Sequence, residues 1–198
     1  MYDTHKHLIE FLTGVLIGIA GIILFTISVW AVEPMKLGQT VSEELEIYPY
    51  QQQIDEAQEY LTTYKIVIPE TVEKYCIKYG EEYGICPELL EAICWTESNC
   101  KENVSSSDGS CKGLMQIKPS SHRKRMSRLG VNNIYDIESN IKVGADYLAE
   151  LACEDSNINI ILARYNGVAD VESVRDNPTD YIKKVLKIAQ SLERVHFK

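Results

Sequence analysis

The chain has 198 residues, of which 45% are hydrophobic and 25% are charged, so it has the composition of an ordinary globular protein with room for one domain and an appendage. Its formal net charge of -9 disfavours a nucleic-acid partner, because binding to phosphates needs a basic face. An acidic surface of this kind usually serves solubility.

The N-terminal region contains a long apolar run. Residues 11–32 carry no charge and match the roughly 20 residues that span a bilayer. The run is longer than the roughly 7–15 apolar residues of a cleaved signal peptide, which favours an uncleaved, single-pass membrane anchor. The alternative is a secreted protein whose signal peptide is cleaved at a site with Val29 at position -3 and Ala31 at position -1. Lys6 before the run and acidic residues after it favour a cytoplasmic N-terminus and an extracytoplasmic remainder.

Helix signals become dense after this region. Residues 50–66 predict a short helix. Pro69 and Pro87 each open a segment with glutamates in its first turn, where the helix dipole favours them, and Gly80 is the expected stop of the first segment. The remaining predicted helices cover residues 119–130, 137–153, 158–166 and 178–195.

These signals define a fold class and a division of the chain. No segment shows the sustained alternation of a β-strand, so we expect an all-α fold preceded by one transmembrane helix. Residues 1–32 would form the cytoplasmic tip and anchor, residues 33–69 a linker or stalk, and residues 70–198 the folded domain.

The six cysteines all lie in the predicted domain, where an exported protein would hold disulfides. Their spacing contains no CxxC pair and no neighbouring histidine pair, so no zinc site is predicted. We expect a disulfide between Cys100 and Cys111, which bracket a Ser/Gly-rich loop, and reduced core cysteines are the alternative.

Glu97 interrupts an apolar helix face. It follows Ile93 by four residues and Cys94 by three, so it continues their stripe, whereas Glu91 is expected to face away. A carboxyl group aimed at a core from the C-terminal end of a helix tends to keep its proton, because desolvation and the helix dipole both disfavour the anion. Such an acid can protonate a glycosidic oxygen. A helix end that drifts off register, with Glu97 in solvent, is the alternative.

Four sequence blocks, in this order, are similar to those of a known enzyme family. They are "ES" at 97–98 with "GLMQI" at 113–117, the segment 129–148, "ARYNG" at 163–167, and "YIKKVL" at 181–186. They resemble the soluble lytic transglycosylases of glycoside hydrolase family 23, which are related in fold to goose-type lysozyme. The resemblance spans about residues 70–198.

The resemblance implies a lysozyme-like domain that cleaves peptidoglycan between N-acetylmuramic acid and N-acetylglucosamine. Glu97 would protonate the leaving-group oxygen and then accept the proton of the muramoyl C6 hydroxyl, which closes a 1,6-anhydro ring. This chemistry implies no cofactor, no metal and no second carboxylate. The positions that match the family's substrate-binding residues are Ser107, Met115, Gln116, Tyr165, Asn166 and Tyr181.

Several of these residues have a second interpretation. Met115 and Tyr165 are alternatively core residues, and Asn166 a helix cap. Asp108, the only aspartate near Glu97 in sequence, fits a turn before a glycine better than a catalytic role.

The loop before Leu114 departs from the family's pattern. Residues 110–113 read Ser-Cys-Lys-Gly where glycine-alanine-x-glycine is usual, and the interval from Glu97 to Gln116 is about one residue longer than usual. Ser106 is therefore an alternative to Ser107 as the substrate-facing serine. A hydrolase that uses Glu97 with water and a non-catalytic wall-binding module are the alternative functions. By analogy, small anchored wall enzymes open the wall for a secretion, conjugation or phage-related apparatus.

Overall fold

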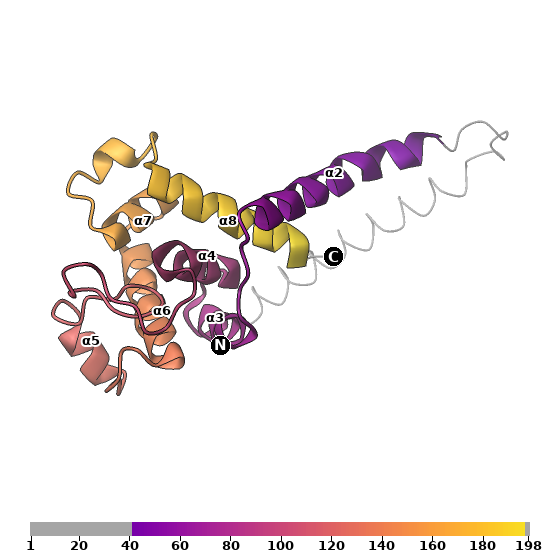
Figure 1. Cartoon of the computed structure of the whole chain (residues 1–198). Helices are drawn as coiled ribbons and strands as arrows, with labels where there is room; N and C mark the ends of the chain where they lie inside the picture. The colour runs from indigo at the N-terminus through magenta and orange to yellow at the C-terminus, as the bar shows by residue number, and fades with distance from the viewer. Residues whose placement is uncertain (1–40, 197–198) are drawn as a thin grey trace, which may run out of the picture. The chain divides into compact units, whose positions relative to one another are not determined.

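The computed structural model describes residues 41–196, and the residues from Tyr50 onward form one compact unit (Figure 1). The predicted anchor over residues 11–32 lies outside the described residues. The helices are α2 (Val41–Thr63), α3 (Glu70–Tyr83), α4 (Pro87–Ser98), α5 (Arg123–Arg128), α6 (Ile137–Glu154), α7 (Ile158–Asn166), the short 3₁₀ helix η1 (Glu172–Val174) and α8 (Asp180–His196).

The predicted all-α fold is confirmed for this part of the chain. Residues 41–196 contain no β-strand, and their only β-type pairing is two isolated bridges, Ser105 with Lys112 and Lys112 with Ile117. None of the helices in this range is both long and apolar enough to cross a membrane.

Two helix boundaries differ from the predicted ones. α3 continues through Gly80 and ends at Gly84, which adopts the left-handed conformation (φ 67°) and donates its backbone N–H to the Gly80 carbonyl. Gly80 has a packing role instead, because a Cβ at this position would lie 2.7 Å from the Ile85 carbonyl oxygen. α2 begins at Val41, nine residues before the predicted start at residue 50.

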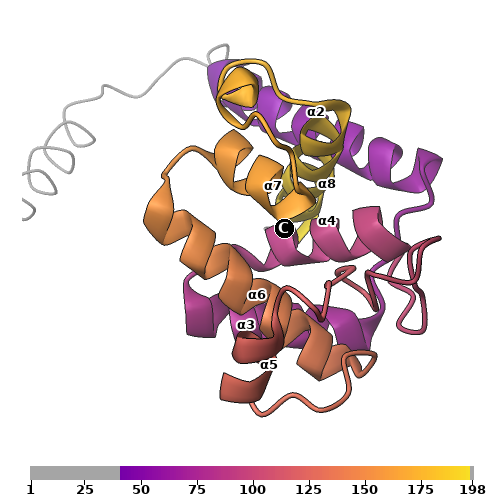
Figure 2. The same ribbon diagram turned by 90° about the vertical axis from the view of Figure 1, so that its left-hand side faces the viewer.

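α4 is the central helix of the domain and packs against α8 on one side and α3 on the other (Figure 2). Leu90, Ala92, Ile93 and Cys94 are all fully buried. Glu91 was expected to face solvent, but its side chain is only 1% exposed. The prediction was wrong because α4 is covered on two faces, so a residue off the apolar stripe still meets a neighbouring helix.

The buried Glu91 carboxyl is poorly solvated. Its Oε2 has no hydrogen-bond partner among the described residues. Burial raises the pKa of Glu91 to about 7, while the charge of His196 lowers it and Glu88 and Glu73 raise it further. A group whose folded-state pKa is raised stabilises the fold most below the pKa of the unfolded chain, and that stability is lost as pH rises through the folded pKa.

We expect the free energy of unfolding to fall by roughly 2–3 kcal/mol between pH 5 and pH 8 through Glu91 alone. Glu91→Gln removes the titrating group, so the variant should show a flatter pH dependence and a higher Tm than the parent at pH 8. Thermal unfolding at several pH values measures both. Parallel Tm–pH curves for parent and variant would contradict this assignment.

Candidate active site

The end of α4 places Glu97 at an abrupt turn of the chain. Asn99 and Cys100 follow the helix in the left-handed conformation, with φ of 52° and 57°. The Asn99 N–H donates to the Trp95 carbonyl at 2.8 Å, and the Cys100 N–H donates to the Cys94 carbonyl at 3.2 Å. These bonds satisfy the last carbonyl groups of the helix and fix the position of its final turn, which carries Glu97.

Ser98 joins this turn to the loop that follows. Its side chain is buried, and its hydroxyl lies 3.0 Å from the Cys94 carbonyl and 2.8 Å from the Leu114 carbonyl. The "ES" and "GLMQI" blocks, which are sixteen residues apart at Ser98 and Leu114, are thereby in direct contact.

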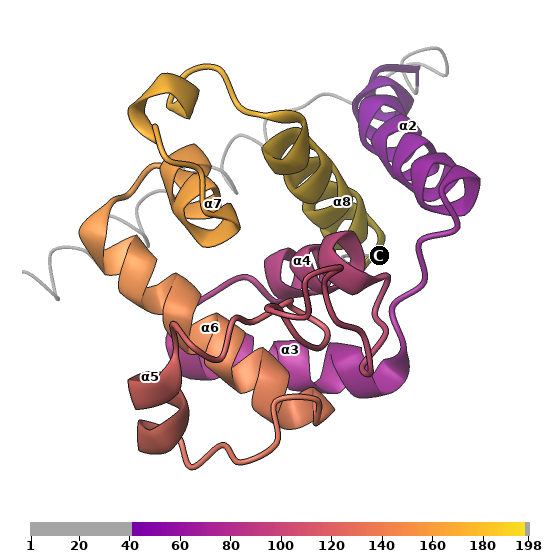
Figure 3. The ribbon, with the colours of Figure 1, turned by 60° about the vertical axis from the view of Figure 1, so that its left-hand side comes forward.

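Asn140, on α6, also holds this loop. Figure 3 shows the position of α6 in the domain. The Asn140 side chain is 0% exposed, accepts from the Met115 N–H at 2.8 Å and donates to the carbonyls of Lys112 (3.0 Å) and Ile134 (2.7 Å). Only glycine fits at position 113, because a Cβ there would lie 2.2 Å from the Asn140 amide nitrogen. Asn140 was not recognised in the sequence, although it lies within the 129–148 block.

Glu97 is half-buried beside α8. Its Oε1 accepts a hydrogen bond of 2.7 Å from the Tyr181 hydroxyl. Burial raises the pKa of Glu97 above its ordinary value, while the Tyr181 hydrogen bond and the positive charge of Lys184 offset part of that rise. No carboxylate acts on the pKa of Glu97 in the part of the chain that the structure describes. Glu97 is therefore an acid that keeps its proton more readily than an exposed glutamate.

Tyr165 and Asn166, at the end of α7, extend this arrangement. The Tyr165 hydroxyl donates to the Met115 carbonyl at 2.8 Å. Burial raises the pKa of Tyr165 well above its ordinary value, and the charges of Tyr181 and Glu97 act in the same direction, so Tyr165 stays neutral. Burial raises the pKa of Tyr181 well above its ordinary value, and the neighbouring Asn166 amide offsets a small part of that rise. The predicted residues Tyr165, Asn166 and Tyr181 thus gather around Glu97.

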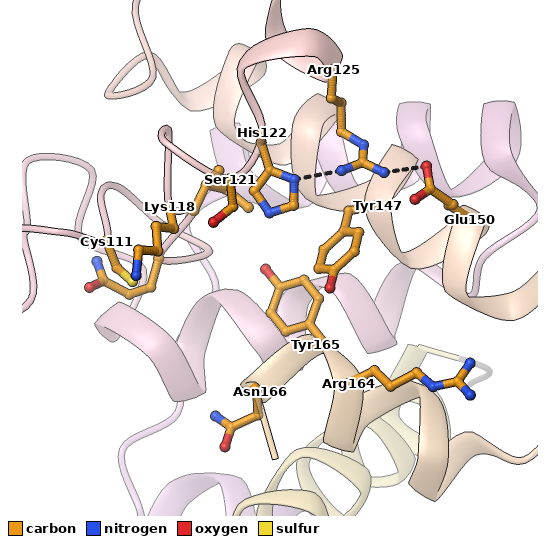
Figure 4. A pocket seen from close by; sticks show the side chains of 13 residues that line it. Cys111, Lys118, Ser121, His122, Arg125, Tyr147, Glu150, Arg164, Tyr165 and Asn166 are labelled. Atoms are coloured by element: carbon orange, nitrogen blue, oxygen red, sulfur yellow. Dashed lines mark hydrogen bonds and ion pairs between the residues drawn. The ribbon is translucent and has the colours of Figure 1, made fainter. Parts of the chain in front are cut away.

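A cavity of about 520 Å³, here called the Tyr165 pocket, opens next to these residues and is shown in Figure 4. Gln116, Tyr165 and Asn166 all line it, as expected for substrate-binding residues. Tyr147 stands beside Tyr165 with ring centroids 5.6 Å apart, and His122 follows at 4.6 Å from Tyr147. The three rings form one row along the pocket.

The far end of the Tyr165 pocket is charged. Arg125 is buried, pairs with Asp146 at 2.7 Å and Glu150, and lies 4.7 Å from the centre of the Tyr147 ring. His122, Arg125 and Tyr147 were not recognised as pocket residues in the sequence. Residues 122–125 form a basic run, but only the fold shows that α6 supplies the acidic partners of Arg125.

Three predicted substrate-binding residues are not among those that line the pocket: Ser107, Met115 and Tyr181, the last of which hydrogen-bonds Glu97 instead. The Met115 side chain is 0% exposed and packs against Gly144, where a Cβ would lie 2.3 Å from the methionine sulfur. The side chain is thus part of the core in this structure, and a substrate-binding role for Met115 stays a prediction. Ser107 is exposed in its loop, and its role stays a prediction.

The rest of the Ser/Gly loop is organised as a turn. The Asp108 carboxylate accepts from the Ser106 hydroxyl (2.5 Å) and the Ser110 N–H (3.0 Å), which lowers the pKa of Asp108 to about 2. An exposed carboxylate that is ionised and used in its own turn matches the turn interpretation rather than an acid catalyst. The Ser106 hydroxyl is occupied in this turn, where it also accepts from the Cys111 N–H at 3.0 Å.

The predicted Cys100–Cys111 disulfide is wrong for this structure, in which all six cysteines are free. The Cys100 thiol is close enough to Cys76 for their charges to interact, and Cys76 in turn hydrogen-bonds Cys94. Cys111 instead lines the Tyr165 pocket. The loop that separates Cys100 and Cys111 in sequence does not bring them together, because the bridges of Lys112 and the Asp108 turn set its shape.

Comparison with known proteins identifies relatives in several organisms. The chain is 31% identical over 106 residues to the transglycosylase of Enterobacteria phage PRD1, covering 54% of this chain and 38% of that protein. It is 40% identical over 81 residues to the endo-type membrane-bound lytic murein transglycosylase A of Klebsiella pneumoniae strain 342, covering 37% and 39%. It is 38% identical over 76 residues to the X polypeptide of Escherichia coli, covering 35% and 44%. The chain thus spans about two fifths of the length of these curated relatives.

Among solved structures, an inactive mutant of the lytic transglycosylase Slt from Pseudomonas aeruginosa matches 65% of this chain and 22% of its own, with 19% sequence identity and a TM-score of 0.48. The family model described as the transglycosylase SLT domain matches residues 74–185, which include Glu97, the loop at 113–117 and Tyr181. Because this match covers more than half of the chain, the protein belongs to the transglycosylase SLT domain family.

Proposed function

We propose that this protein is a peptidoglycan lytic transglycosylase in which Glu97 acts as general acid and then as general base. The observation that carries the proposal is the half-buried Glu97 carboxyl, with its raised pKa and its 2.7 Å hydrogen bond from Tyr181. Family membership and the names of the relatives, which include a lytic murein transglycosylase, support the substrate class.

The proposed reaction uses one carboxyl group twice. Protonated Glu97 donates its proton to the glycosidic oxygen as the bond from that oxygen to muramoyl C1 breaks, so the departing strand leaves with a C4 hydroxyl on its terminal N-acetylglucosamine. The C6 hydroxyl oxygen then bonds to C1 and gives its proton to the Glu97 carboxylate. A 1,6-anhydro ring forms, the acid is regenerated and no water is consumed.

Tyr181 and Lys184 tune this cycle. Both stabilise the carboxylate that forms after the first proton transfer, and burial favours the acid that starts the next cycle. The amides of Gln116 and Asn166 and the ring row at Tyr165 are available to hold sugars in the Tyr165 pocket. Ser107 is proposed as a further contact from the loop.

Two alternatives share this geometry. A lysozyme-like hydrolase would use Glu97 with a water molecule, and a wall-binding module would bind glycan without cleaving it. No second carboxylate among the described residues acts on Glu97, which favours transglycosylation. A two-carboxylate glycosidase needs the second carboxylate to activate water or to attack the sugar.

We further propose that residues 11–32 anchor the protein in the cell membrane, with the catalytic domain outside the cytoplasm, where its wall substrate lies. Service to a secretion, conjugation or phage-related apparatus is proposed by analogy, and the phage relative supports it.

This orientation predicts that a C-terminal alkaline phosphatase fusion is active and a C-terminal fluorescent reporter that folds only in the cytoplasm is dark. The opposite pattern would place the domain in the cytoplasm and refute the proposed location.

Glu97→Gln should reduce the release of soluble fragments from purified sacculi by at least about a hundredfold, because an amide cannot donate the proton. Glu91→Gln is the matched control, since it makes the same chemical change on the same helix away from the site. It should keep the parent's rate. If Glu97→Gln, folded as judged by its Tm, digests sacculi as fast as the parent, Glu97 is not the catalytic acid.

Tyr181→Phe should lower kcat about tenfold and move the alkaline limb of the pH–rate profile to higher pH. Removing the hydroxyl raises the pKa of Glu97 further, so the acid keeps its proton to a higher pH. Tyr135→Phe, which removes a hydroxyl bonded to Ser105, is the control and should leave the profile in place. An alkaline limb that does not move in Tyr181→Phe would show that this limb does not report Glu97.

A further inference from the structure

A second cavity, here called the Tyr64 pocket, is lined by residues from the end of α2 and just after it, from α8 and from the end of α4. Figure 3 shows these three helices. The volume of the pocket is about 460 Å³, within the roughly 300–1,000 Å³ of small-molecule sites. Three of its lining residues are aromatic and two are polar: the lining includes Tyr60, Tyr64, Trp95, Asn99, Lys184 and Ile188.

One aromatic side chain of the Tyr64 pocket is exposed to solvent, and the other two, Tyr60 and Trp95, are half-buried. Tyr64 is 62% exposed, which is unusual for a large aromatic residue, and its ring lies 4.7 Å from that of Tyr60 at an angle of 46°. The Tyr60 ring is itself fixed by α8, since the Lys187 ammonium lies 5.4 Å from its centre. Exposed aromatic surface that is held in place beside a cavity marks a binding site.

The polar residues of this pocket have hydrogen-bonding capacity to spare. The Asn99 side-chain amide makes no hydrogen bond within residues 51–196, although its backbone caps α4. Lys184 adds an ammonium group that can donate to hydroxyl or carbonyl oxygens. Aromatic faces with a nearby amide match an N-acetylated sugar, whose apolar ring face can pack on Tyr64 or Trp95 while its acetamido group pairs with Asn99.

The Tyr64 pocket and the Tyr165 pocket share no lining residue, and each is connected to Glu97 through one of its lining residues. Lys184 lines the Tyr64 pocket, and its charge also acts on Glu97. It follows Tyr181, the hydrogen-bond donor to Glu97, by one turn of α8. Tyr165 lines the other pocket and is coupled to Glu97 as well. Two separate cavities are thus connected to the acid, which suits a substrate that is a polymer.

We propose that the Tyr64 pocket binds one N-acetylated hexosamine residue of the glycan strand, separately from the Tyr165 pocket. The inference rests on the proposed function, and it assigns a substrate-binding role to the end of α2. Tyr60 and Tyr64 lie outside the family match at 74–185, so this subsite is an addition that α2 makes to the family's domain.

Tryptophan fluorescence gives a direct test, because the chain has two tryptophans, Trp30 and Trp95, and Trp95 lines the pocket. The full-length chain carrying Trp30→Phe and Glu97→Gln, in mild detergent, is titrated with the β-1,4-linked tetramer of N-acetylglucosamine. We expect a saturable change in Trp95 emission. Tyr64→Ala should weaken binding about tenfold, and Tyr64→Phe, which keeps the ring, should stay within about twofold of the parent.

Two further variants complete the test. Asn99→Gly keeps the left-handed backbone and removes only the amide, so it should weaken binding several-fold. Val67→Ala truncates a side chain that is 68% exposed but lies outside the lining, and it should bind as the parent does.

The outcomes separate this inference from the proposed function. Suppose that the protein with Glu97 intact cuts sacculi, but that Tyr64→Ala binds the tetramer as tightly as the parent. The Tyr64 pocket is then not a sugar subsite, and the proposed function stands. Absence of any Trp95 response, as when another part of the chain fills the pocket, also overturns the inference. If Trp95 reports binding that depends on Tyr64 while sacculi stay intact, the subsite is supported and the proposed function fails.

Discussion

The buried amide of Asn140 is the interaction on which the rest of the site depends. It satisfies three backbone groups of the loop and its neighbour, at Lys112, Met115 and Ile134. Loss of this amide would leave those groups unsatisfied, at a cost of about 1–3 kcal/mol for each buried group. Ser98 then ties the same loop to the last turn of α4. The position of Glu97 is thus set by two polar contacts as well as by apolar packing.

The electrostatics of Glu97 follow from this placement. A carboxyl group at the solvent-exposed end of a helix would ionise near its ordinary pKa, but here burial opposes ionisation while Tyr181 and Lys184 favour it. The balance leaves an acid that can both donate and recover a proton. The two separate cavities, at Tyr165 and at Tyr64, suit the proposed polymeric substrate.

Sequence patterns predicted the helical fold and the residues around Glu97 because both depend on local signals or short motifs. Tyr165, Asn166 and Tyr181 lie where their blocks indicated. Glu91 could not be predicted as buried, because periodicity reports one face of a helix and α4 is covered on two. Gly80 carries the same signal as a helix stop and a close-packing glycine, and only the contact with the Ile85 carbonyl distinguishes them.

Contacts between distant segments account for the remaining differences. The proximity of Cys100 to Cys76, rather than to Cys111, results from the packing of α3 on α4. The charged end of the Tyr165 pocket joins α5 to α6, and the Tyr64 pocket joins α2 to α8, so neither forms a motif in the chain. Hydrogen-bonding hubs such as Asn140 are equally hard to recognise, since an asparagine on a helix more often faces solvent.

The masses of the muropeptides that the full-length chain releases from purified sacculi test the central claim most directly. Transglycosylation by Glu97 alone predicts fragments that end in 1,6-anhydromuramic acid, lighter by one water molecule than their hydrolysed counterparts. Fragments with reducing muramic acid ends would show that water attacks the sugar, and would contradict an acid that works without a second reactant.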